Sequence, residues 1–597
     1  MNVRERKLQD ILFTTENKQV DSQLFFSSNK AIEITSDNSM KASKGSVICF
    51  ESYFNSFSIA KWKKYTHIEK IELELCFCGK AEITLMAHKI LYGEKNTTVV
   101  YQCVVENDKF NTIRIPYDEI PNVISYSFSI TVLSDTFELI NGCYVSNKEL
   151  ENNFVNLAIV FTTYNREQYL LNNIANICNV KDENLHIYVV DNASNLSLNS
   201  DAKITVIPNR NVGGAGGFAR GMIQIIEDQT TRRFTHCLLM DDDAFIDSNI
   251  LKRLILFLQF IKEEYTDAFV SGAMLRKDLS YYQVESGALW NDGKIKSNGH
   301  GVDLRSAFMV LNNNMESESD YAAWWFCTIP IKYIRNDNLP LPVFVFNDDV
   351  DYGIRNGCKI ITLNGICVWH DAFESKRNAM RCYYESRNQL IVNSCNKRSL
   401  EVKDLIKDLK KTIMMEINLY QYENAQATLE GIQDFLKGPE WLAKIDAEEF
   451  NRTIIKKNIK LRRYDTLSID YDWYRLCCTI KDCDWLHGMV RRLTQNGYYL
   501  KADRDIVLPL YATNIEAGYR ARKIIYYDEI TGMGFEVKRN KIRKKQILKE
   551  YRKVSSMLKS QFKKISSEYE QSYEYLISRE QWDRYLNLQI EANKKLR

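Results

Sequence analysis

Residues 156–165 read NLAIVFTTYN, an apolar run that ends in polar residues. The same pattern recurs in LHIYVVDNAS (185–194), ITVIPN (204–209) and THCLLMDDDAF (235–245), and a helical pattern, REQYLLNNIANI, separates the first two runs. Strands that are apolar throughout and alternate with helices are typical of a parallel sheet that is covered on both faces. We therefore predict a Rossmann-like, doubly wound α/β domain over residues 154–392.

Two segments with other patterns flank this region. Residues 1–153 contain short runs such as KIELELCFCG and YSFSITVLS, which are rich in β-branched and aromatic residues and are separated by Gly, Asn and Asp. This spacing predicts an N-terminal β-sandwich. Residues 393–597 contain long stretches with helical spacing of apolar residues, so we predict a mainly helical C-terminal domain.

The bulk composition excludes some classes of protein. The 597 residues carry a formal net charge of only +3, so no overall field draws the chain to nucleic acid. No apolar run reaches about 18 residues, and the first residues lack the apolar core of a secretory signal. We expect a cytoplasmic protein. The stretch 538–553, with nine Lys or Arg and one acid, predicts either peripheral contact with anionic lipid at the inner face of the plasma membrane, a solvated helix face or a subunit contact.

The fifteen cysteines show no repeated short spacing. RLCCT (475–479) and KDCDW (481–485) lie close together but lack a second pair of cysteines and histidines at zinc-finger spacing. We therefore expect reduced thiols, as is usual in a cytosolic protein.

Three consecutive aspartates, Asp241, Asp242 and Asp243, follow the apolar run at 236–240. Adjacent carboxylates repel one another unless a cation neutralises them, and their oxygens suit Mg²⁺ or Mn²⁺. On an extended backbone Asp241 and Asp243 point to the same side and Asp242 points away. A solvated loop or a helix N-cap is the alternative, but ligands bind beyond the carboxyl ends of strands in doubly wound sheets. This position favours a metal site.

The other predicted strands also end in polar residues. Thr162, Thr163 and Arg166 follow the first run, and Asp191 ends the second. The third leads into NRNVGGAGGFARGM, which has four glycines in five residues before a predicted helix and matches neither the dinucleotide fingerprint nor the phosphate-binding P-loop. These glycines either let the backbone approach an anionic ligand or form a tight turn. Asn211, just before them, is a further candidate contact.

A second acidic cluster follows the apolar run VFVF at 343–346. Here Asp348, Asp349 and Asp351 either cap the helix predicted at DVDYGIRN or include a general base for an acceptor hydroxyl. His370 ends another apolar run, GICVWH, in the same predicted domain. A neutral imidazole at that position can complete a metal shell, although a single histidine is more often structural.

Two adjacent tryptophans, Trp324 and Trp325, precede the run FCTIP. If they lie on a strand they face opposite ways, so one packs in the core and the other offers a platform for a sugar ring. Packing of both in the core is the alternative. Glu285 lies on a loop-like stretch and, taken alone, is a surface acid.

These motifs together resemble one known family. The order TTYNR, VDN, NVGGAGGF, DDDA, WW, DDVDYG and WHD between residues 157 and 390 is similar to that in the bacterial galactofuranosyltransferases, including the galactan-polymerising enzymes of mycobacteria. The family implies a GT-A catalytic domain between an N-terminal β-sandwich and a helical C-terminal region. One departure is Asn347, where the mycobacterial pattern has Trp. It leaves open the acceptor and whether the enzyme polymerises.

The resemblance implies a role for each matching residue. It implies that Asp349 is the general base and that the metal, Mn²⁺ or Mg²⁺, is held by Asp241, Asp243 and His370. It implies that nucleotide and donor are bound by Thr162, Thr163, Arg166, Asp191, Asn211 and Asp242. It implies that donor or acceptor sugar contacts Glu285, Trp324, Trp325 and Asp348.

The implied reaction is inverting, metal-dependent transfer of galactofuranose from UDP-galactofuranose to a glycan acceptor of the galactan, O-antigen or capsule type. The expected acceptor is linked to a polyprenyl diphosphate, with no nucleic acid partner, and formation of a homo-oligomer is left open. Three alternatives remain: a GT-A transferase for another donor such as dTDP-rhamnose or UDP-galactopyranose, a non-catalytic glycan-binding scaffold, and a nucleotide-sugar phosphodiesterase.

Overall fold

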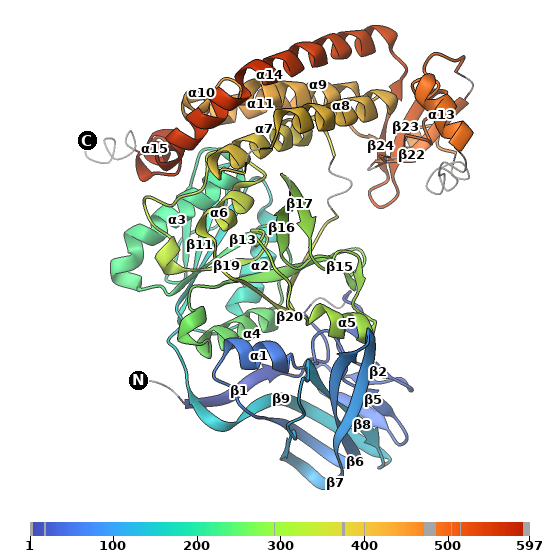
Figure 1. The fold of residues 1–597 in the computed structure, drawn as a ribbon. Coiled ribbons are helices and arrows are strands. Elements are labelled where there is room, and N and C mark those ends of the chain that lie inside the picture. The colour runs from blue at the N-terminus through green and yellow to red at the C-terminus, as the bar shows by residue number, and fades with distance from the viewer. Residues whose placement is uncertain are drawn as a thin grey trace.

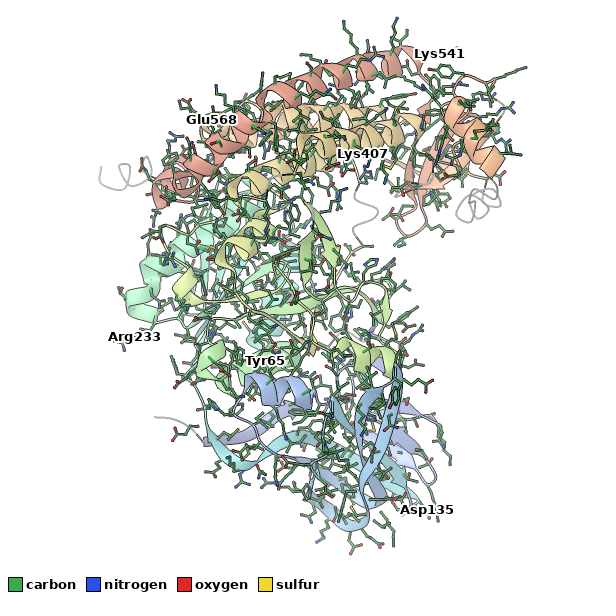
Figure 2. All side chains as sticks on the ribbon, in the orientation of Figure 1. Tyr65, Asp135, Arg233, Lys407, Lys541 and Glu568 are labelled. Carbon is green, nitrogen blue, oxygen red and sulfur yellow. The ribbon has the colours of Figure 1, made fainter. Side chains whose placement is uncertain are left out.

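The computed structural model describes residues 4–16, 19–291, 293–372, 377–398, 400–470, 485–502, 504–510, 512–513 and 515–588. Three parts follow one another along the chain and lie in a row, with the α/β part between an N-terminal β-rich part and a helical C-terminal part (Figure 1). Figure 2 adds the side chains in the same view. The middle part is described first, because it carries the candidate site.

The middle part is built on a nine-stranded sheet of order β12-β11-β10-β13-β19-β14-β15-β18, with β20 paired to β14. Strands β10 to β13 are parallel to one another, whereas β19 runs antiparallel to both β13 and β14. The strands are β10 (Leu157–Thr163), β11 (Leu185–Asp191), β12 (Ile204–Pro208), β13 (His236–Asp241), β14 (Phe269–Arg276), β15 (Tyr282–Glu285), β18 (Val302–Asp303), β19 (Cys327–Pro330) and β20 (Ile360–His370).

Helices cover both faces of this sheet. The first five residues of strand β10 are buried; among them, Ile159 and Phe161 pack in one hydrophobic core with residues of α2 and α4, whereas Ala158 and Val160 pack in another core with residues of α3. This explains why residues 157–161 are all apolar, and it agrees with the predicted doubly wound α/β domain. The remaining elements of this part are α2 (Glu167–Cys178), α3 (Gly213–Arg232), α4 (Ser248–Gln259), α5 (Ala307–Asn313), α6 (Asp348–Asn356), and the hairpin β16 (Ala288–Asn291) and β17 (Lys294–Ser297).

The N-terminal part consists of antiparallel strands, as expected for a β-sandwich, but hydrogen bonds join them into one nine-stranded sheet. The long strand β6 bends at Gly79, pairs through its first half with β9 and pairs through its second half with β8. It therefore links what would otherwise be two sheets. The elements are β1 (Arg4–Asp10), β2 (Ser27–Ser28), β3 (Glu33–Ile34), β4 (Met40–Ser43), β5 (Val47–Cys49), α1 (Ile59–Tyr65), β6 (Ile71–Leu91), β7 (Glu94–Pro116), β8 (Ser125–Val132) and β9 (Thr136–Glu151).

The C-terminal part is mainly helical, as predicted, but it also contains a small sheet that the sequence analysis missed. This sheet has the order β21-β24-β23-β22. The predicted domain boundary after residue 392 lies inside α7, which packs against α9 and α14. The elements are α7 (Ala379–Cys395), α8 (Val402–Asn418), α9 (Tyr422–Phe435), α10 (Pro439–Lys444), α11 (Ala447–Ile455), β21 (Arg462–Arg463), α13 (Trp485–Leu493), β22 (Arg504–Pro509), β23 (Ala521–Asp528), β24 (Met533–Lys538), α14 (Lys541–Leu576) and α15 (Arg579–Tyr585).

Two expectations concern the whole chain. Every cysteine that the structure describes is a free thiol, whereas Cys477, Cys478 and Cys483 lie outside the described residues. Within the described part of the chain, no helix combines the length and the apolar character needed to cross a bilayer.

Candidate active site

The carboxyl ends of the central strands meet at one edge of the sheet. Thr163 of β10 lies opposite Asp191 of β11, and Thr162 lies opposite Asp241 of β13. Because the strands are parallel and in register, residues from distant parts of the chain lie side by side at this edge. It is also the edge at which doubly wound sheets bind their ligands.

The first acidic cluster is joined to His370 by a short β-bridge. Phe245 and Trp369 exchange two backbone hydrogen bonds, which brings the turn after β13 next to the end of β20. One ligand atom each of Asp241, Asp243 and His370 then lies within 4.8 Å of the others. The helix N-cap alternative does not hold, because Asp247 caps α4 instead.

Two carboxylates and one imidazole in this arrangement fit a divalent cation. The Nδ1 atom of His370 lies 2.7 Å from the carbonyl oxygen of Asp371 and donates to it, which leaves Nε2 to face Asp243 Oδ1 at 3.1 Å. An unprotonated Nε2 and a carboxylate oxygen at this distance need a proton or a metal cation between them. Burial, followed by the charge of Asp243, raises the pKa of Asp241 to about 7. The donor set of oxygen and imidazole nitrogen suits Mn²⁺ or Mg²⁺.

Asp242 lies outside this group and contacts Arg166. The Nη1 atom of Arg166 is 3.1 Å from Asp242 Oδ1 and 2.7 Å from Asp243 Oδ2. Asp242 and Asp243 lie in a turn and not on the extended backbone that the sequence analysis assumed. Burial raises the pKa of Asp242, and the Arg166 guanidinium and the Thr163 hydroxyl oppose that rise. Arg166 thus brings a fixed positive charge to this edge of the sheet.

The side chain of Asp191 holds the loop that follows β11. Its carboxylate accepts backbone hydrogen bonds from Ala193 at 2.9 Å, Asn195 at 2.7 Å and Leu196 at 2.8 Å. These contacts are structural. Nucleotide contact by Asp191 stays a prediction that the geometry neither supports nor opposes.

Two other predicted donor residues also bind neighbouring protein groups. Thr162 accepts from Asn192 at 3.0 Å through its hydroxyl, and Asn211 accepts from the Gly213 amide at 3.1 Å. A cavity opens next to Asp241, and neither residue is among the described residues that line it. Both lie where the strand ends meet the start of α3.

The glycine-rich stretch serves close packing at most of its positions. Gly213 has φ of 78°, and a Cβ atom there would lie 1.9 Å from the carbonyl oxygen of Phe344. A Cβ atom on Gly217 would lie 1.8 Å from the hydroxyl of Thr162. Gly214 differs, because a Cβ atom there would meet nothing within 4 Å and the residue lines the cavity. The tight turn and the open approach to a ligand thus both occur in this stretch.

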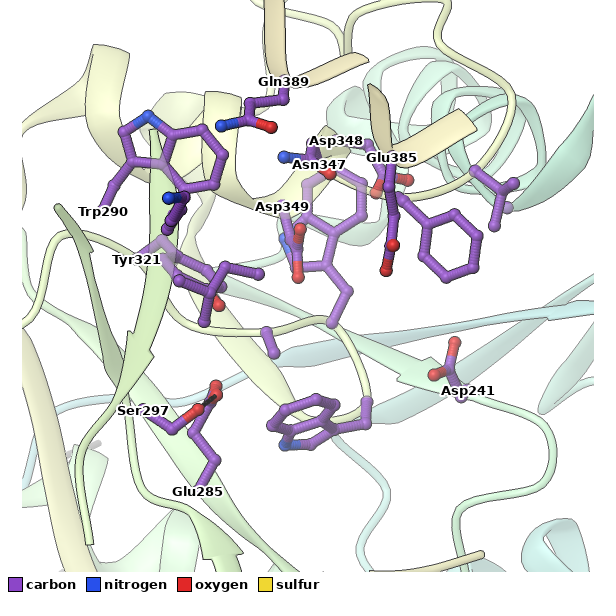
Figure 3. Close-up of a pocket in the computed structure, with 18 of the residues that line it drawn as sticks. Asp241, Glu285, Trp290, Ser297, Tyr321, Asn347, Asp348, Asp349, Glu385 and Gln389 are labelled. Carbon is purple, nitrogen blue, oxygen red and sulfur yellow. Dashed lines mark hydrogen bonds between the residues drawn. The ribbon is translucent and has the colours of Figure 1, made fainter. Parts of the chain in front are cut away.

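A cavity of about 580 Å³ opens next to Asp241 (Figure 3). Its walls come from the start of α3, the hairpin β16–β17, the loop before α6 and one face of α7. The predicted site residues in its lining are Asp241, Glu285, Trp324, Trp325, Asp348 and Asp349. Residues from six separate stretches of the chain, between 214 and 389, therefore meet around one hollow.

Asp348 and Asp349 begin α6, so the predicted helix start is present and carries both residues. Burial, opposed by the Val350 amide and aided by the charges of Glu285 and Asp241, raises the pKa of Asp349 to about 7. Burial and the neighbouring Asp349 raise the pKa of Asp348 to about 8. A carboxyl group with a pKa near 7 can gain and lose a proton at neutral pH, which a general base requires.

Asp351, the third member of the second cluster, has a structural position. Its buried carboxylate bonds to Arg355 at 2.8 Å, to the Tyr573 hydroxyl at 2.6 Å and to Asn396 at 2.8 Å. It therefore ties α6 to the end of α7 and to α14.

Glu285 is buried and lines the cavity, so it is not the surface acid that it would be if taken alone. Its Oε2 accepts from the Ser297 hydroxyl at 2.5 Å, while Oε1 has no hydrogen-bond partner within the described chain. Burial raises the pKa of Glu285 to about 7, and the bond from Ser297 opposes the rise. A buried, unsatisfied carboxylate oxygen is suited to accept from a sugar hydroxyl.

The two tryptophans lie in a turn before β19, and not on a strand as the sequence analysis assumed. Trp324 packs edge-on against Phe218 and Tyr352, with ring centroids 5.2 Å and 5.6 Å away. Trp325 is half-buried and donates from its indole nitrogen to the Gly272 carbonyl at 3.1 Å. Both contribute to the cavity lining, Trp324 from the core and Trp325 from a fixed position at its edge.

Sequence analysis did not single out the face of α7 that closes the cavity. Arg381, Glu385 and Gln389 recur every fourth residue, so they share one face of the helix, and all three line the cavity. Their spacing is visible in the sequence, but a polar helical stripe usually faces solvent. Only packing against the hairpin β16–β17 turns this stripe inward, where Gln389 bonds to the Gly293 carbonyl.

Two protein-family models match this chain. The family model described as "Galactofuranosyltransferase 2 N-terminal" matches residues 8–137, and the model described as "Glycosyl transferase family 2" matches residues 158–292. The second match covers β10 to β13 and all three aspartates of the first cluster. This protein is a glycosyltransferase. Its middle part has a GT-A-like fold.

Curated relatives confirm the resemblance to galactofuranosyltransferases. The glycosyltransferase is 23% identical over 450 residues to galactofuranosyltransferase GlfT2 of Mycobacterium tuberculosis (strain ATCC 25618 / H37Rv), which covers 68% of each chain. It is 23% identical over 449 residues to GlfT2 of Mycolicibacterium smegmatis (strain ATCC 700084 / mc(2)155), which covers 68% of this chain and 66% of that protein.

Two solved structures match this chain with low TM-scores. TarS 1-349 of S. aureus is 13% identical with a TM-score of 0.29, over 51% of this glycosyltransferase and 88% of that chain. Mannosyltransferase PcManGT from Pyrobaculum calidifontis, in complex with GDP-Man and Mn²⁺, is 11% identical with a TM-score of 0.25, over 50% and 80%. Scores this low add nothing to the assignment.

Proposed function

We propose that this glycosyltransferase moves galactofuranose from UDP-galactofuranose to a sugar hydroxyl of a growing cell-surface glycan, with inversion at the anomeric carbon. The observation that carries the proposal is the shared cavity: the candidate base Asp349 and the candidate metal ligand Asp241 line the same hollow. The motif order and the galactofuranosyltransferase relatives support the choice of donor.

The chain supplies a group for each requirement of the reaction. Asp241, Asp243 and His370 would hold Mn²⁺ or Mg²⁺, which supplies Lewis-acid charge next to the diphosphate when bound. Arg166 adds positive charge on the same side. Negative charge that develops on the departing UDP is therefore met by groups already in place.

Asp349 acts on the other side of the anomeric carbon. Its carboxylate accepts the proton of the acceptor hydroxyl while that oxygen forms a bond to the anomeric carbon and the bond to the UDP oxygen breaks. A single displacement of this kind inverts the centre and leaves no sugar on the enzyme. Glu285 and Asp348 bind sugar hydroxyls, and Trp325 forms the wall against which a ring packs.

The test is an assay with UDP-galactofuranose, Mn²⁺ or Mg²⁺ and synthetic galactosyl acceptors, followed by linkage analysis of the product. Asp349→Asn serves as the matched inactive variant. If the protein turned over UDP-galactopyranose or dTDP-rhamnose but not UDP-galactofuranose, the proposed donor would be wrong. UDP release that is indifferent to acceptor would indicate a phosphodiesterase, and glycan binding without turnover of any donor would indicate a scaffold.

The lipid-linked acceptor and peripheral membrane contact belong to the same proposal. The basic stretch 538–553 covers the start of α14, and Lys541, Lys545, Lys549 and Arg552 are exposed along it; Lys541 is labelled in Figure 2. Flotation with anionic liposomes at low and high salt tests the contact. We expect binding that salt abolishes, and absence of binding at low salt would contradict membrane contact.

A further inference from the structure

The loop that leads into the catalytic helix α6 has an unusual backbone. Phe344, Phe346 and Asn347 have φ of 73°, 66° and 69°, in the left-handed region that residues with side chains rarely adopt. The next two residues are Asp348 and Asp349. Strain of this kind persists only where the surrounding structure holds it, and it gathers at functional sites.

The side chain of Asn388, from α7, binds three backbone carbonyls of this loop. Asn388 is fully buried, and its Nδ2 lies 2.7 Å from the Val345 carbonyl oxygen, 3.0 Å from that of Phe346 and 3.2 Å from that of Val343. Its Oδ1 accepts from Nε of Arg387 at 2.9 Å. The carbonyls on one side and the guanidinium on the other fix the orientation of the amide.

Two other groups also bind carbonyls of the loop. Arg387 donates from Nη2 to Val343 at 2.7 Å, and the Ala215 amide at the start of α3 donates to Phe344 at 3.2 Å. Among these donors, Asn388 alone reaches the carbonyls of Val345 and Phe346, which stand three and two residues before Asp348.

We propose that Asn388 is the positioning residue for Asp349: by holding the left-handed loop, it aims the carboxylate of Asp349 at the acceptor hydroxyl. The inference rests on the proposed function, because it assumes that Asp349 is the base. Displacement of a reacting group by about 1 Å can cost about 10²-fold in rate. Loss of the Asn388 contacts to the loop is therefore expected to lower turnover without affecting the residues that are proposed to bind the donor and the metal.

The test compares Asn388→Ala with Asn388→Ser. The serine hydroxyl keeps one hydrogen-bond donor, and serine changes the shape of the side chain less than alanine does. The number of UDP sites per chain in the presence of Mn²⁺, and their affinity, are measured by calorimetry, and turnover is expressed per UDP site. We expect about one site of unchanged affinity, with turnover about tenfold lower or more for Asn388→Ala and less reduced for Asn388→Ser. Normal turnover per site in both variants would overturn the role, as would loss of UDP sites in both.

A matched control separates positioning from general destabilisation. Asn55 is also fully buried, and its amide donates at 2.7 Å to the carbonyls of Leu12 and Phe25 in the N-terminal part. Asn55→Ala should lower the melting temperature while leaving turnover per UDP site unchanged. Equal loss of turnover per site in Asn55→Ala would count against a specific role of Asn388.

A double-variant cycle tests the route through Asp349. If Asn388 acts by aiming Asp349, Asn388→Ala should lower the turnover of the wild-type chain but not the residual turnover of Asp349→Asn. Equal effects in both backgrounds would overturn the proposal. Absence of galactofuranose transfer by the wild-type chain would instead count against the proposed function, so the two failures are distinguishable.

Discussion

Turnover is predicted to depend on pH through Asp349. Burial, aided by the charges of Glu285 and then Asp241, raises the pKa of this residue to about 7. A base works only when it is ionised, so activity is present above that pKa and is lost as the pH falls through it. The experiment varies the pH and measures kcat/KM.

The size of the effect follows from the pKa. A carboxyl group with a pKa of about 7 is about one-tenth ionised at pH 6 and about nine-tenths ionised at pH 8, so kcat/KM should rise roughly tenfold between them. An aspartate at its ordinary value of 3.8 is ionised throughout this interval and would give no change. A cation held by Asp241 would oppose this rise and move the midpoint to lower pH.

The assay is donor turnover from pH 5 to 9 at saturating acceptor and constant Mn²⁺. Glu285→Gln serves as the diagnostic variant, because it removes the larger neighbouring charge and should move the midpoint to lower pH. A flat profile between pH 5 and 8 would refute the raised pKa of Asp349. An unchanged midpoint in Glu285→Gln would refute the contribution of the Glu285 charge to this pKa.

Three further predictions concern residues of the candidate site and the buried contacts of Asp351. Asp349→Asn should retain UDP binding by calorimetry, yet turnover should fall about 10²-fold or more; near-full turnover would exclude it as the base. His370→Ala should weaken Mn²⁺-dependent UDP binding by roughly tenfold or more, since it removes one of the proposed ligands, and unchanged Mn²⁺ titration would contradict the ligand set. Tyr573→Phe should lower the free energy of unfolding by about 1–2 kcal/mol, because it removes a bond to the buried carboxylate of Asp351, and an unchanged melting curve would argue against that network.

The strand ends were predictable from sequence because their signal is local. An apolar run such as that of β10 needs cover on both faces, and a polar residue directly after it must lie at an edge of the sheet. Asp241 and His370 were therefore placed correctly at this edge, although His370 and the residue it contacts, Asp243, are 127 positions apart in the sequence. The wrong details, the extended backbone at Asp242 and the strand at Trp324, concern turns, where backbone geometry depends on tertiary contacts.

Other features had no local signal. The runs DIVLPL and RKIIYYDE, which form β22 and β23, have strand character, but they lie among helical patterns and were not recognised. Asn388 looks like any polar residue of a helix, because its partners are carbonyls more than 40 positions away.

The sequence by itself determined which chemical groups this glycosyltransferase owns, and it determined the sheet edge to which most of them belong, because apolar periodicity dictates what must be buried. Only the tertiary structure decided how those groups act together. It turned a polar face of α7 into a cavity wall, buried Glu285 and Asp349 so that their pKa values rose, and held a strained loop in place. Burial and charge–charge distances arise from packing between segments, and no single segment encodes them.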